Sequence, residues 1–448
     1  MAPIHCDIAI IGAGVSGLIA ARSLATSDRS VVVLEARNRV GGRVLTARVP
    51  IPTAATPAVV ELGAEFIHGL PPESWTLLRT GGLATFELGG EPLRSANGRI
   101  MSASQDYAGS GSVLQRMQQW ADGDLGTRDI TFSEFLRFAR IDGVEAQRAI
   151  QYVEGFNAAD SQRISVASLA QQQRAEDAIQ GERLFRLTDG YDLLPQFLRR
   201  QYEQAGGRVL LGHHVVRVEW QRSSARIQGT CAGGAEFDVR ARAAVVTVPL
   251  GVLHAGSIDF APAPGDMLVQ AARMAMGSAL RVTLTFESPF WHQDPALERM
   301  GFVFADDELP GVWWTASPQP APTITGWSGG ARSVAAVMSR AASGTGSDAM
   351  TQSHLEILAR MLGRDTGTLQ RLLVSGRWHN WDADEFSRGA YSFVPSGAVN
   401  ASERMTEPVA DTLFFAGEHT DTSGHWGTVH GALRSGLRAA AQLQRALT

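Results

Sequence analysis

The chain has 448 residues, of which 44% are hydrophobic, a formal net charge of −5 and only two cysteines, Cys6 and Cys231. This length suggests two or three domains around a large core. The charge gives no reason to expect a nucleic-acid partner, and two distant cysteines exclude a disulfide framework or a metal cluster built on cysteine. With no apolar run long enough for a membrane span and no room for a leader, we expect a cytoplasmic protein without metal or membrane contact.

A β-α-β unit is predicted at the start of the chain. Residues 7–11 and 31–34 are short apolar runs typical of buried parallel strands, and residues 14–25 show helical spacing of apolar side chains. The first strand leads into Gly12-Ala13-Gly14-Val15-Ser16-Gly17, a G-x-G-x-x-G motif. In this motif Gly12 permits a tight turn, Gly14 lets the backbone approach a pyrophosphate, and Gly17 lets the helix pack closely on the sheet.

Glu35 ends the second strand, at the spacing where a carboxylate accepts hydrogen bonds from a nucleotide ribose. An ordinary strand-turn-helix corner would need the glycines for packing alone, but the strand, the spacing and the acid together favour a nucleotide site. Arg37, Arg39 and Arg43 then bracket Gly41-Gly42, a backbone that fits against a diphosphate with guanidinium groups nearby. The glycine motif by itself does not separate NAD from FAD, and this second glycine pair with its arginines helps to do so.

Later segments predict how the domains are assembled. Residues 208–220 and 226–240 are predicted to be strands of a hairpin or meander, and 243–248 and 412–416 to be buried strands. The end of the chain from about residue 428 is predicted to be a helix. Residues 280–286 alternate strictly, with Arg281, Thr283 and Thr285 on one face, which predicts a half-exposed antiparallel strand. We expect an α/β fold in which residues 1–75, 205–270 and 388–448 form a discontinuous nucleotide-binding domain with a Rossmann core. Residues 76–204 and 271–387 are expected to form a mixed α+β substrate-binding domain.

The segment Leu34–Arg43 resembles the FAD fingerprint of the flavin-containing amine oxidases, a family of monoamine oxidases, polyamine oxidases and flavin-type histone lysine demethylases. Five further segments resemble the family in the same order along the chain: 62–69, closest to the polyamine-oxidase version, then 247–253, 381–393, 414–420 and 427–432.

The resemblance implies an FAD site. Glu418 would accept hydrogen bonds from the ribityl hydroxyls of FAD. The alternative is that Glu418 is only an acid in the first turn of a helix, with no contact to the cofactor. The amides of Thr428 and Val429 would reach the pyrimidine edge of the flavin. The implied cofactor-binding residues are Gly12, Gly14, Val15, Ser16, Gly17, Glu35, Ala36, Arg37, Gly42, Arg43, Gly63, Ala64, Glu65, Val215, Trp381, Gly417, Glu418, Thr428 and Val429.

The resemblance also implies a substrate side, formed by Tyr391, Trp381, His68, Thr428 and Arg281. Tyr391 would present an aromatic face to an amine; a core tyrosine with a satisfied hydroxyl is the alternative, and core packing is also the alternative for Trp381. The nearby acids Asp382, Asp384 and Glu385 would form a patch that attracts an extended cation toward the mouth of the cavity.

The chain departs from the family at three positions. Ala390 stands where monoamine oxidases carry the cysteine that binds flavin covalently, so FAD is expected to bind noncovalently. Thr428 stands where several members have a second aromatic residue, which together with the first forms a cage around the substrate. Arg281 stands where the family has a lysine that holds a water near flavin N5; its strand face is either solvated or turned to the cavity.

The implied reaction is oxidation of a primary or secondary amine, polyamine-like or other. A hydride passes from the amine α-carbon to flavin N5, the imine hydrolyses, and oxygen or another acceptor reoxidises the flavin, with hydrogen peroxide formed from oxygen. Two alternatives remain open. An L-amino-acid oxidase, or another FAD-dependent dehydrogenase or desaturase, would share the nucleotide site, and Arg281 would then hold a substrate carboxylate. A flavoprotein scaffold with little turnover is the second alternative. The sequence does not indicate the oligomeric state.

Overall fold

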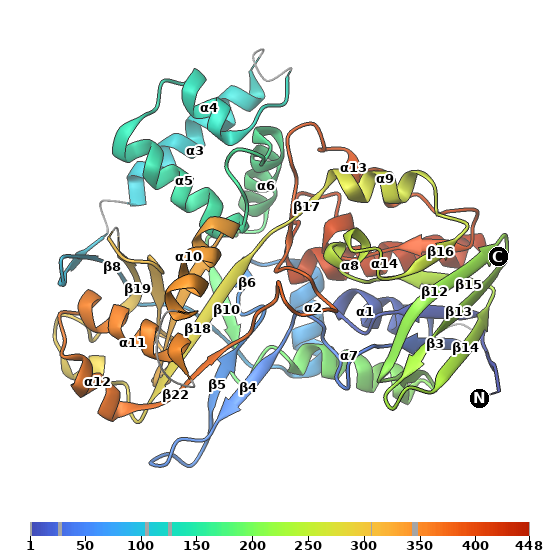
Figure 1. Ribbon diagram of the computed structural model, residues 1–448, viewed down its shortest axis with the longest axis horizontal. Coiled ribbons are helices and arrows are strands. Elements are labelled where there is room, and N and C mark those ends of the chain that lie inside the picture. The colour runs from blue at the N-terminus through green and yellow to red at the C-terminus, as the bar shows by residue number, and fades with distance from the viewer. Residues whose placement is uncertain are drawn as a thin grey trace.

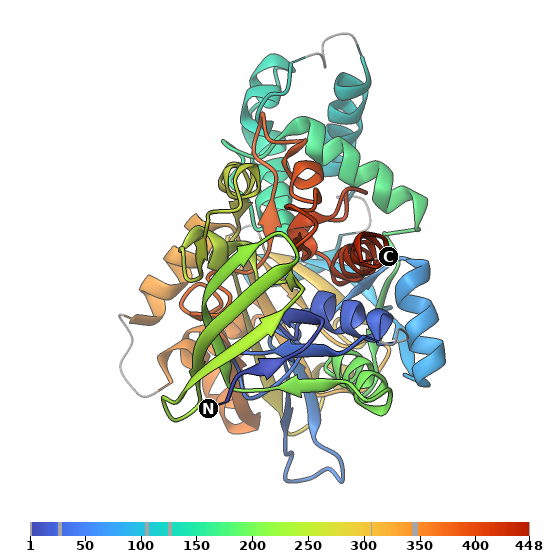
Figure 2. The same cartoon turned by 90° about the vertical axis from the view of Figure 1, so that its right-hand side faces the viewer.

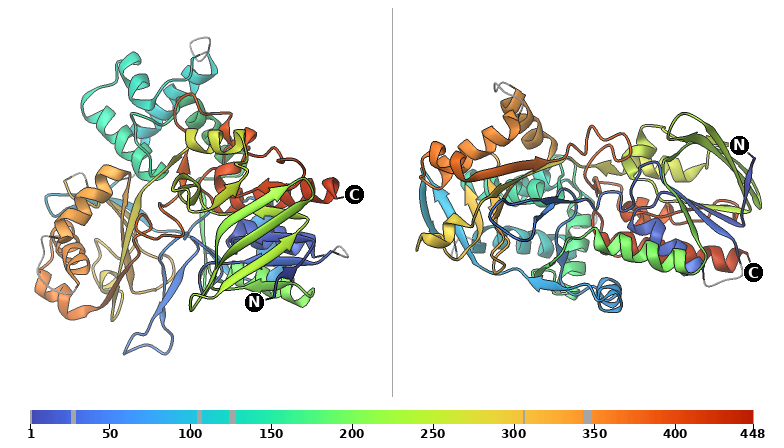
Figure 3. Two further views of the ribbon diagram at one scale, coloured as in Figure 1. Left: turned by 45° about the vertical axis from the view of Figure 1, so that its right-hand side comes forward. Right: turned by 90° about the horizontal axis from the view of Figure 1, so that it is seen from below.

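The structure is a computed structural model that describes residues 2–25, 29–103, 107–123, 128–305, 307–342 and 348–447. Figure 1 shows the parallel sheet and its helices on one side, a second large sheet with helices α10–α12 on the other, and a lobe of helices α3–α6 above them. The β4–β5 hairpin, Thr46–Val49 and Ala58–Glu61, extends from between the two sheet-containing lobes (Figures 1 and 3).

The parallel sheet is built from segments far apart in sequence. Its order is β11-β3-β2-β15-β24, and each neighbouring pair runs parallel. The strands span Arg208–Leu210, Val31–Leu34, Ile8–Ile11, Ala243–Val246 and Leu413–Phe415 in that order. The four strands other than β11 are buried along their whole length, because helices cover one face and a second sheet covers the other. The predicted Rossmann-type core assembled from separate segments is confirmed.

The two faces of this sheet have separate hydrophobic cores. Ile8 and Ile10 pack with helices α1 (Val15–Leu24), α7 (Leu193–Gln204) and α14 (Val429–Ala446). Ala9 and Ile11 pack against the sheet β1-β14-β13-β12-β16, which lies across the parallel strands in Figure 2. The strands of this second sheet span Ile4–His5, Glu236–Ala241, Ser224–Cys231, His213–Gln221 and Asp259–Ala261.

The second large sheet has the order β22-β18-β21-β20-β19-β8-β9 and is mixed, because β19 pairs with β8 in parallel and the other pairs are antiparallel. Its strands span Leu373–Trp378, Ala279–Phe286, Thr323–Gly329, Val312–Trp314, Met300–Ala305, Glu91–Ala96 and Arg99–Ser102. The helices α10 (Ala331–Ala342), α11 (Ala349–Met361) and α12 (Thr366–Leu372) cover one of its faces.

The expectation that residues 280–286 form a half-exposed strand is wrong. All eight residues of β18 are buried. Its apolar side chains pack in the core under α11, and the opposite face is covered by the chain around Glu61 and Gly63, whose carbonyls accept hydrogen bonds from Arg281. Thr283 satisfies its hydroxyl on Thr325 across the sheet, at 2.9 Å. The alternation therefore separates two buried environments, and the solvated reading of the Arg281 face is excluded.

The helical lobe has its own hydrophobic core. It contains α3 (Tyr107–Asp122), α4 (Phe132–Phe138), α5 (Gly143–Asn157) and α6 (Val166–Ala178). The helix α4 begins with a capping box, in which Thr131 and Glu134 satisfy each other's backbone amides. Ser165 is the N-cap of α6, and its hydroxyl accepts from the Ser168 amide.

Short elements connect these lobes. They are α2 (Pro72–Gly81), the small sheet of β6 (Ile67–His68), β10 (Leu184–Leu187) and β7 (Thr85–Glu87), the pair β17 (Ala275–Met276) and β23 (Ser392–Phe393), and the helices α8 (Leu250–His254), α9 (Asp266–Arg273) and α13 (Ala401–Arg404).

The division into two domains stays a prediction. Leu77 and Leu78 of α2 and most of the apolar residues of α7 pack in the same core as α1, although the predicted boundaries place these residues in the substrate-binding domain. None of the described helices is long and apolar enough to cross a membrane.

Candidate active site

A cavity of about 1150 Å³ runs from the glycine motif to an aromatic wall between the lobes. Every residue predicted to bind FAD or substrate lines it, except Gly17. Gly17 has the packing role predicted for it, because a Cβ built there would lie 2.0 Å from the Gly12 carbonyl oxygen. One continuous cavity thus joins the predicted nucleotide site to the predicted substrate side.

The glycine motif forms an open cradle at one end of the cavity. A Cβ built on Gly14 would meet nothing within 4 Å, so this glycine is not required for packing within the protein. Gly14 is the N-cap of α1 and provides no side-chain cap, which leaves the first amides of the helix available to an anion. The Gly41 amide donates to the Ala13 carbonyl at 2.9 Å, which brings the second glycine pair beside the first motif.

Glu35 lies against the same cradle. Its carboxylate accepts from the Ala13 amide at 2.7 Å and the Arg37 amide at 2.9 Å, and only 4% of the residue is exposed. Burial raises the pKa of Glu35, while the two amides act in the opposite direction. Each carboxylate oxygen keeps a further lone pair for a ribose hydroxyl. Together with the open cradle, this arrangement fits a dinucleotide with a free 2′-hydroxyl.

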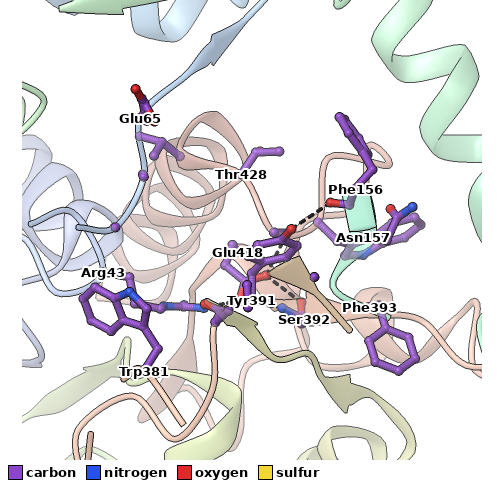
Figure 4. A pocket seen from close by; sticks show the side chains of 18 of the residues that line it. Arg43, Glu65, Phe156, Asn157, Trp381, Tyr391, Ser392, Phe393, Glu418 and Thr428 are labelled. Carbon is purple, nitrogen blue, oxygen red and sulfur yellow. Dashed lines mark hydrogen bonds and ion pairs between the residues drawn. The ribbon is translucent and has the colours of Figure 1, made fainter. Parts of the chain in front are cut away.

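The carboxylate of Glu418 is the centre of a second polar group, shown in Figure 4. It accepts from Arg43 Nη1 at 2.7 Å, from the Gly427 amide at 2.9 Å and from Ser392 Oγ. Burial raises the pKa of Glu418, but Arg43 and the other donors outweigh this effect and lower the pKa overall. Glu418 begins the three-residue 3₁₀ helix Glu418–Thr420, yet its carboxylate turns to these partners and not to the helix amides. The alternative reading as a plain helix-start acid is therefore not supported.

The N-terminus of α14 opens onto the cavity beside this group. Thr428 is the N-cap: its hydroxyl accepts from the Gly431 amide at 2.9 Å and donates to the His425 carbonyl at 2.7 Å. Thr428 and Val429 both line the cavity. Because the threonine hydroxyl is already used within the cap, the amides at this helix end are the groups left for a ligand.

Tyr391 belongs to the wall of the cavity. Its hydroxyl donates to the Phe156 carbonyl at 2.7 Å, as Figure 4 shows, and this fixes the orientation of the ring. A Cβ on Gly427 would lie 2.8 Å from that ring, so a glycine is needed for the close approach. Burial raises the pKa of Tyr391 well above its usual value. The hydroxyl has a hydrogen-bond partner, as expected for a tyrosine in the hydrophobic core. Tyr391 nevertheless lines the cavity, which fits its predicted place on the substrate side.

Trp381 and His68 lie on the wall as well. Trp381 donates from Nε1 to the Leu62 carbonyl at 2.8 Å, which ties it to the segment 62–69. His68 meets Phe156 edge-on, with ring centroids 5.7 Å apart. Burial lowers the pKa of His68 to about 4, so the imidazole is neutral at neutral pH and does not repel a cationic substrate.

Arg281 is turned to the cavity and is paired. Its Nη2 lies 2.8 Å from Glu65 Oε2, and Arg186 Nη1 lies 2.9 Å from the other oxygen of the same carboxylate. Burial lowers the pKa of Arg281, and Glu65 counters this effect. The guanidinium also lies over the rings of Trp314 and Trp327.

Sequence reasoning missed Arg186, Trp314 and Trp327. The available signal for Arg186 was a single charged residue in the short apolar run 184–187. A charged side chain in a buried strand needs a partner of opposite charge. The tryptophans gave no signal that separates a cavity wall from a core.

The acidic patch at residues 382–385 is not a cation-attracting mouth. Asp384 forms an ion pair with Arg37, and its carboxylate also lies 2.9 Å from His379 Nε2. These partners inside the protein, near the nucleotide end of the cavity, offset its negative charge. Asp382 does not line the cavity, and Glu385 does. The next residue, Phe386, lies under the Arg37 guanidinium at that end.

Three other acids line the cavity on and after helix α6: Glu176, Asp177 and Glu182. Burial and the neighbouring Asp177 raise the pKa of Glu176 to about 7. The acids at 176–182, and not those at 382–385, are therefore the candidates for binding the distal end of an extended cation. The signal in the sequence was the pair of adjacent acids, Glu176 and Asp177.

Residues 15–444 match the family described as flavin containing amine oxidoreductase. Polyamine oxidase 4 of Oryza sativa subsp. japonica is 27% identical over 466 residues, which cover 98% of this chain and 88% of that protein. Lysine-specific histone demethylase 1 homolog 1 of Arabidopsis thaliana is also 27% identical over 98% of this chain, but the match spans only 52% of the demethylase.

Solved structures with the same fold include putrescine oxidase bound to putrescine, with a TM-score of 0.81 at 22% identity over 99% of this chain and 100% of that chain. Cyclohexylamine oxidase from Brevibacterium oxydans IH-35A has a TM-score of 0.79 at 22% identity over 99% of each chain. The fold, the site and the family match agree. The chain belongs to the flavin-containing amine oxidoreductases and is an FAD-dependent amine oxidase.

Proposed function

We propose that this enzyme binds FAD noncovalently and oxidises a primary or secondary amine that carries a second cationic group, as a diamine or polyamine does. The observation that carries the proposal is that one cavity joins the glycine cradle, the aromatic wall of Tyr391 and the acids Glu176, Asp177 and Glu182. An extended cation placed against the wall has carboxylates within the same cavity for its distal ammonium.

The protein's part in the reaction is binding and exclusion of water. Bound FAD would accept the hydride from the amine α-carbon, and its reduced form would pass the electrons to oxygen, giving hydrogen peroxide, or to another acceptor. Tyr391 holds the amine against the wall through its aromatic face. His68, neutral at physiological pH, adds no charge that would oppose a cation. The fixed aromatic side chains of Tyr391 and Trp381 keep water away from the reacting end of the cavity.

The amino-acid oxidase alternative has less support. It needs a free cation for the substrate carboxylate, and the sequence offers Arg281. In the structure Arg281 is already bound to Glu65 at 2.8 Å and to the Gly63 carbonyl at 2.7 Å. A substrate carboxylate would have to displace a buried acid that is held by two arginines.

The substrate proposal predicts a preference that depends on pH. Anaerobic bleaching of the flavin should be faster with 1,4-diaminobutane than with butylamine, which has the same chain without the second amine. The ratio of their kcat/KM values should rise about tenfold between pH 6 and pH 8, equivalent to about 1.4 kcal/mol. The reason is that Glu176, with a pKa of about 7, becomes negative in this range while the distal amine stays protonated.

Glu176→Gln should flatten this pH dependence, and Glu203→Gln, on the outer part of α7, should leave it intact. Bleaching by an L-amino acid and by no amine would overturn the amine proposal. A diamine preference with no dependence on Glu176 would reject only the assignment of the distal site.

Noncovalent binding predicts that acid precipitation releases yellow FAD into the supernatant. The Ala390 side chain lines the cavity and offers no thiol, and its carbonyl is used by Arg43 at 2.9 Å. Flavin that stays in the acid pellet after washing would contradict the prediction. Absorbance of the supernatant, with chromatography to separate FAD from FMN, is the measurement.

A further inference from the structure

Glu65 is the point where three buried elements meet. Its carboxylate accepts from Arg186 of β10 at 2.9 Å, from Arg281 of β18 at 2.8 Å and from Trp314 Nε1 of β20 at 3.2 Å. The Glu65 side chain is 2% exposed, and the two arginine side chains are 8% and 7% exposed. An acid this deeply buried must be paired, and both of its oxygens are.

The Arg281 guanidinium is held on several sides. Besides Glu65, its Nη1 donates to the carbonyls of Gly63 at 2.7 Å and Glu61 at 3.2 Å. The rings of Trp314 and Trp327 lie 5.5 and 5.8 Å from its central carbon. The Nε–H has no hydrogen-bond partner among the described residues, although it is buried. A side chain that lines the cavity therefore keeps one donor for a ligand or a water molecule.

The cluster Arg186–Glu65–Arg281 has an excess of positive charge. Two arginines are permanently protonated, and one carboxylate offsets one of them. Glu61 is the other acid nearby; burial raises its pKa to about 7, so it is only partly ionised at neutral pH. In a buried environment such an excess acts at longer range than at the surface.

The positive charge of the Arg186–Glu65–Arg281 cluster lies close to Trp381 and to the Arg43–Glu418 pair. Gly63, which accepts from Arg281, is so close to the Arg43 carbonyl that a Cβ on it would lie 1.9 Å away, and 3.1 Å from the Trp381 ring. Arg43 in turn pairs with Glu418 at 2.7 Å. Tyr391 and Arg281 line the same cavity. Arg281 is thus fixed in the part of the cavity where the predicted flavin ring and substrate meet.

We propose that Glu65 is a positioning residue: it holds Arg281 as a fixed, permanent cation in the wall of the cavity and sets the net charge that the bound flavin experiences. The proposal rests on the FAD site proposed above. A positive charge near the ring stabilises reduced flavin, which carries more negative charge than the oxidised form. Arg281 therefore raises the reduction potential of the flavin, and Glu65 limits that rise while it keeps the guanidinium in place.

The test is the midpoint potential of the bound flavin, measured by anaerobic titration against reference dyes. Arg281→Gln should lower the potential and Glu65→Gln should raise it. The double variant should lie between the two single variants, and its shift should differ from their sum because the residues are in contact. Arg281→Lys keeps the charge and should lower the potential less than Arg281→Gln. The control Glu87→Gln changes an acid that pairs with Arg183 at the surface, and it should leave the potential unchanged.

The opposite signs separate this proposal from a purely structural role. If Glu65 and Arg281 only support the fold, both glutamine variants shift the potential in the same direction or leave it unchanged, and the proposal is overturned. Should the glutamine variants fail to fold, Arg281→Lys still decides. A small fall in the potential supports the proposal, because lysine keeps the charge but not all the contacts that fix the guanidinium. An unchanged or higher potential, or a fall well below the wild-type value, would overturn it. A wild-type protein that binds no FAD would instead refute the proposed function.

Discussion

Glu418→Ala is expected to abolish FAD retention and to lower the free energy of unfolding of the apoprotein by about 3–5 kcal/mol. The carboxylate accepts from Arg43, Ser392 and Gly427, and removing it leaves Arg43 without its acid in a largely buried site. The Glu418 side chain is 5% exposed and that of Arg43 is 21% exposed, so solvent replaces little of the lost interaction. Urea unfolding of both apoproteins and a flavin-binding titration are the measurements.

The surface pair Arg183–Glu87 provides the control. Its distance is 2.7 Å, the same as that of Arg43–Glu418, but its side chains are 38% and 44% exposed. Glu87→Ala is expected to leave both FAD retention and the urea midpoint unchanged, because water screens and replaces an exposed ion pair. Equal losses in the two variants would show that burial of the Glu418 group has no special part in the site.

Gly14→Val is expected to weaken FAD binding by roughly 100-fold, about 2.8 kcal/mol, and to leave the stability of the apoprotein nearly unchanged. The φ of Gly14 is −68° with extended ψ, which valine adopts without strain, and a Cβ there meets no protein atom within 4 Å. The added side chain would occupy the cradle in which a pyrophosphate needs to approach the backbone.

Gly17→Ala is the counterpart, five residues after Gly12 in the same motif. Its Cβ would lie 2.0 Å from the Gly12 carbonyl oxygen, so the apoprotein should lose about 1–3 kcal/mol of its free energy of unfolding. Thermal unfolding of the apoproteins separates the two variants. A large loss of stability in Gly14→Val, with FAD affinity retained by the folded fraction, would contradict the assignment of the cradle.

The sequence predicts the nucleotide end of the molecule well because its signals are local. The Gly12–Gly17 motif, the strand that precedes it and Glu35 all lie within one β-α-β unit, so short-range spacing determines their geometry. The prediction that Gly41-Gly42 lies along the pyrophosphate site is supported by the hydrogen bond from Gly41 to Ala13. The apolar runs 243–248 and 412–416 correctly predict two further strands of the parallel core.

The errors come from contacts between distant segments. Alternation in residues 280–286 correctly separates two faces, but it does not reveal that the chain near Glu61 covers the polar face. Asp384 is predicted to help attract a cation, but the fold brings Arg37 to it from the other end of the chain. The partners of Glu65 come from strands more than 100 residues away, and no local pattern in the sequence joins them.

The strand order β11-β3-β2-β15-β24 has a consequence for biosynthesis. The innermost strands pair residues 8–11 with residues 243–246, and those with residues 413–415. During translation the first strand and its glycine turn leave the ribosome long before the strands on their far side exist, and the helix that follows β24 comes later still. Because pairing at such long sequence separation is slow and leaves an unpaired edge in the meantime, the nascent chain carries an incomplete sheet through most of its synthesis. We therefore expect the cofactor to be captured only after residues 413–446 have been made and have joined the sheet.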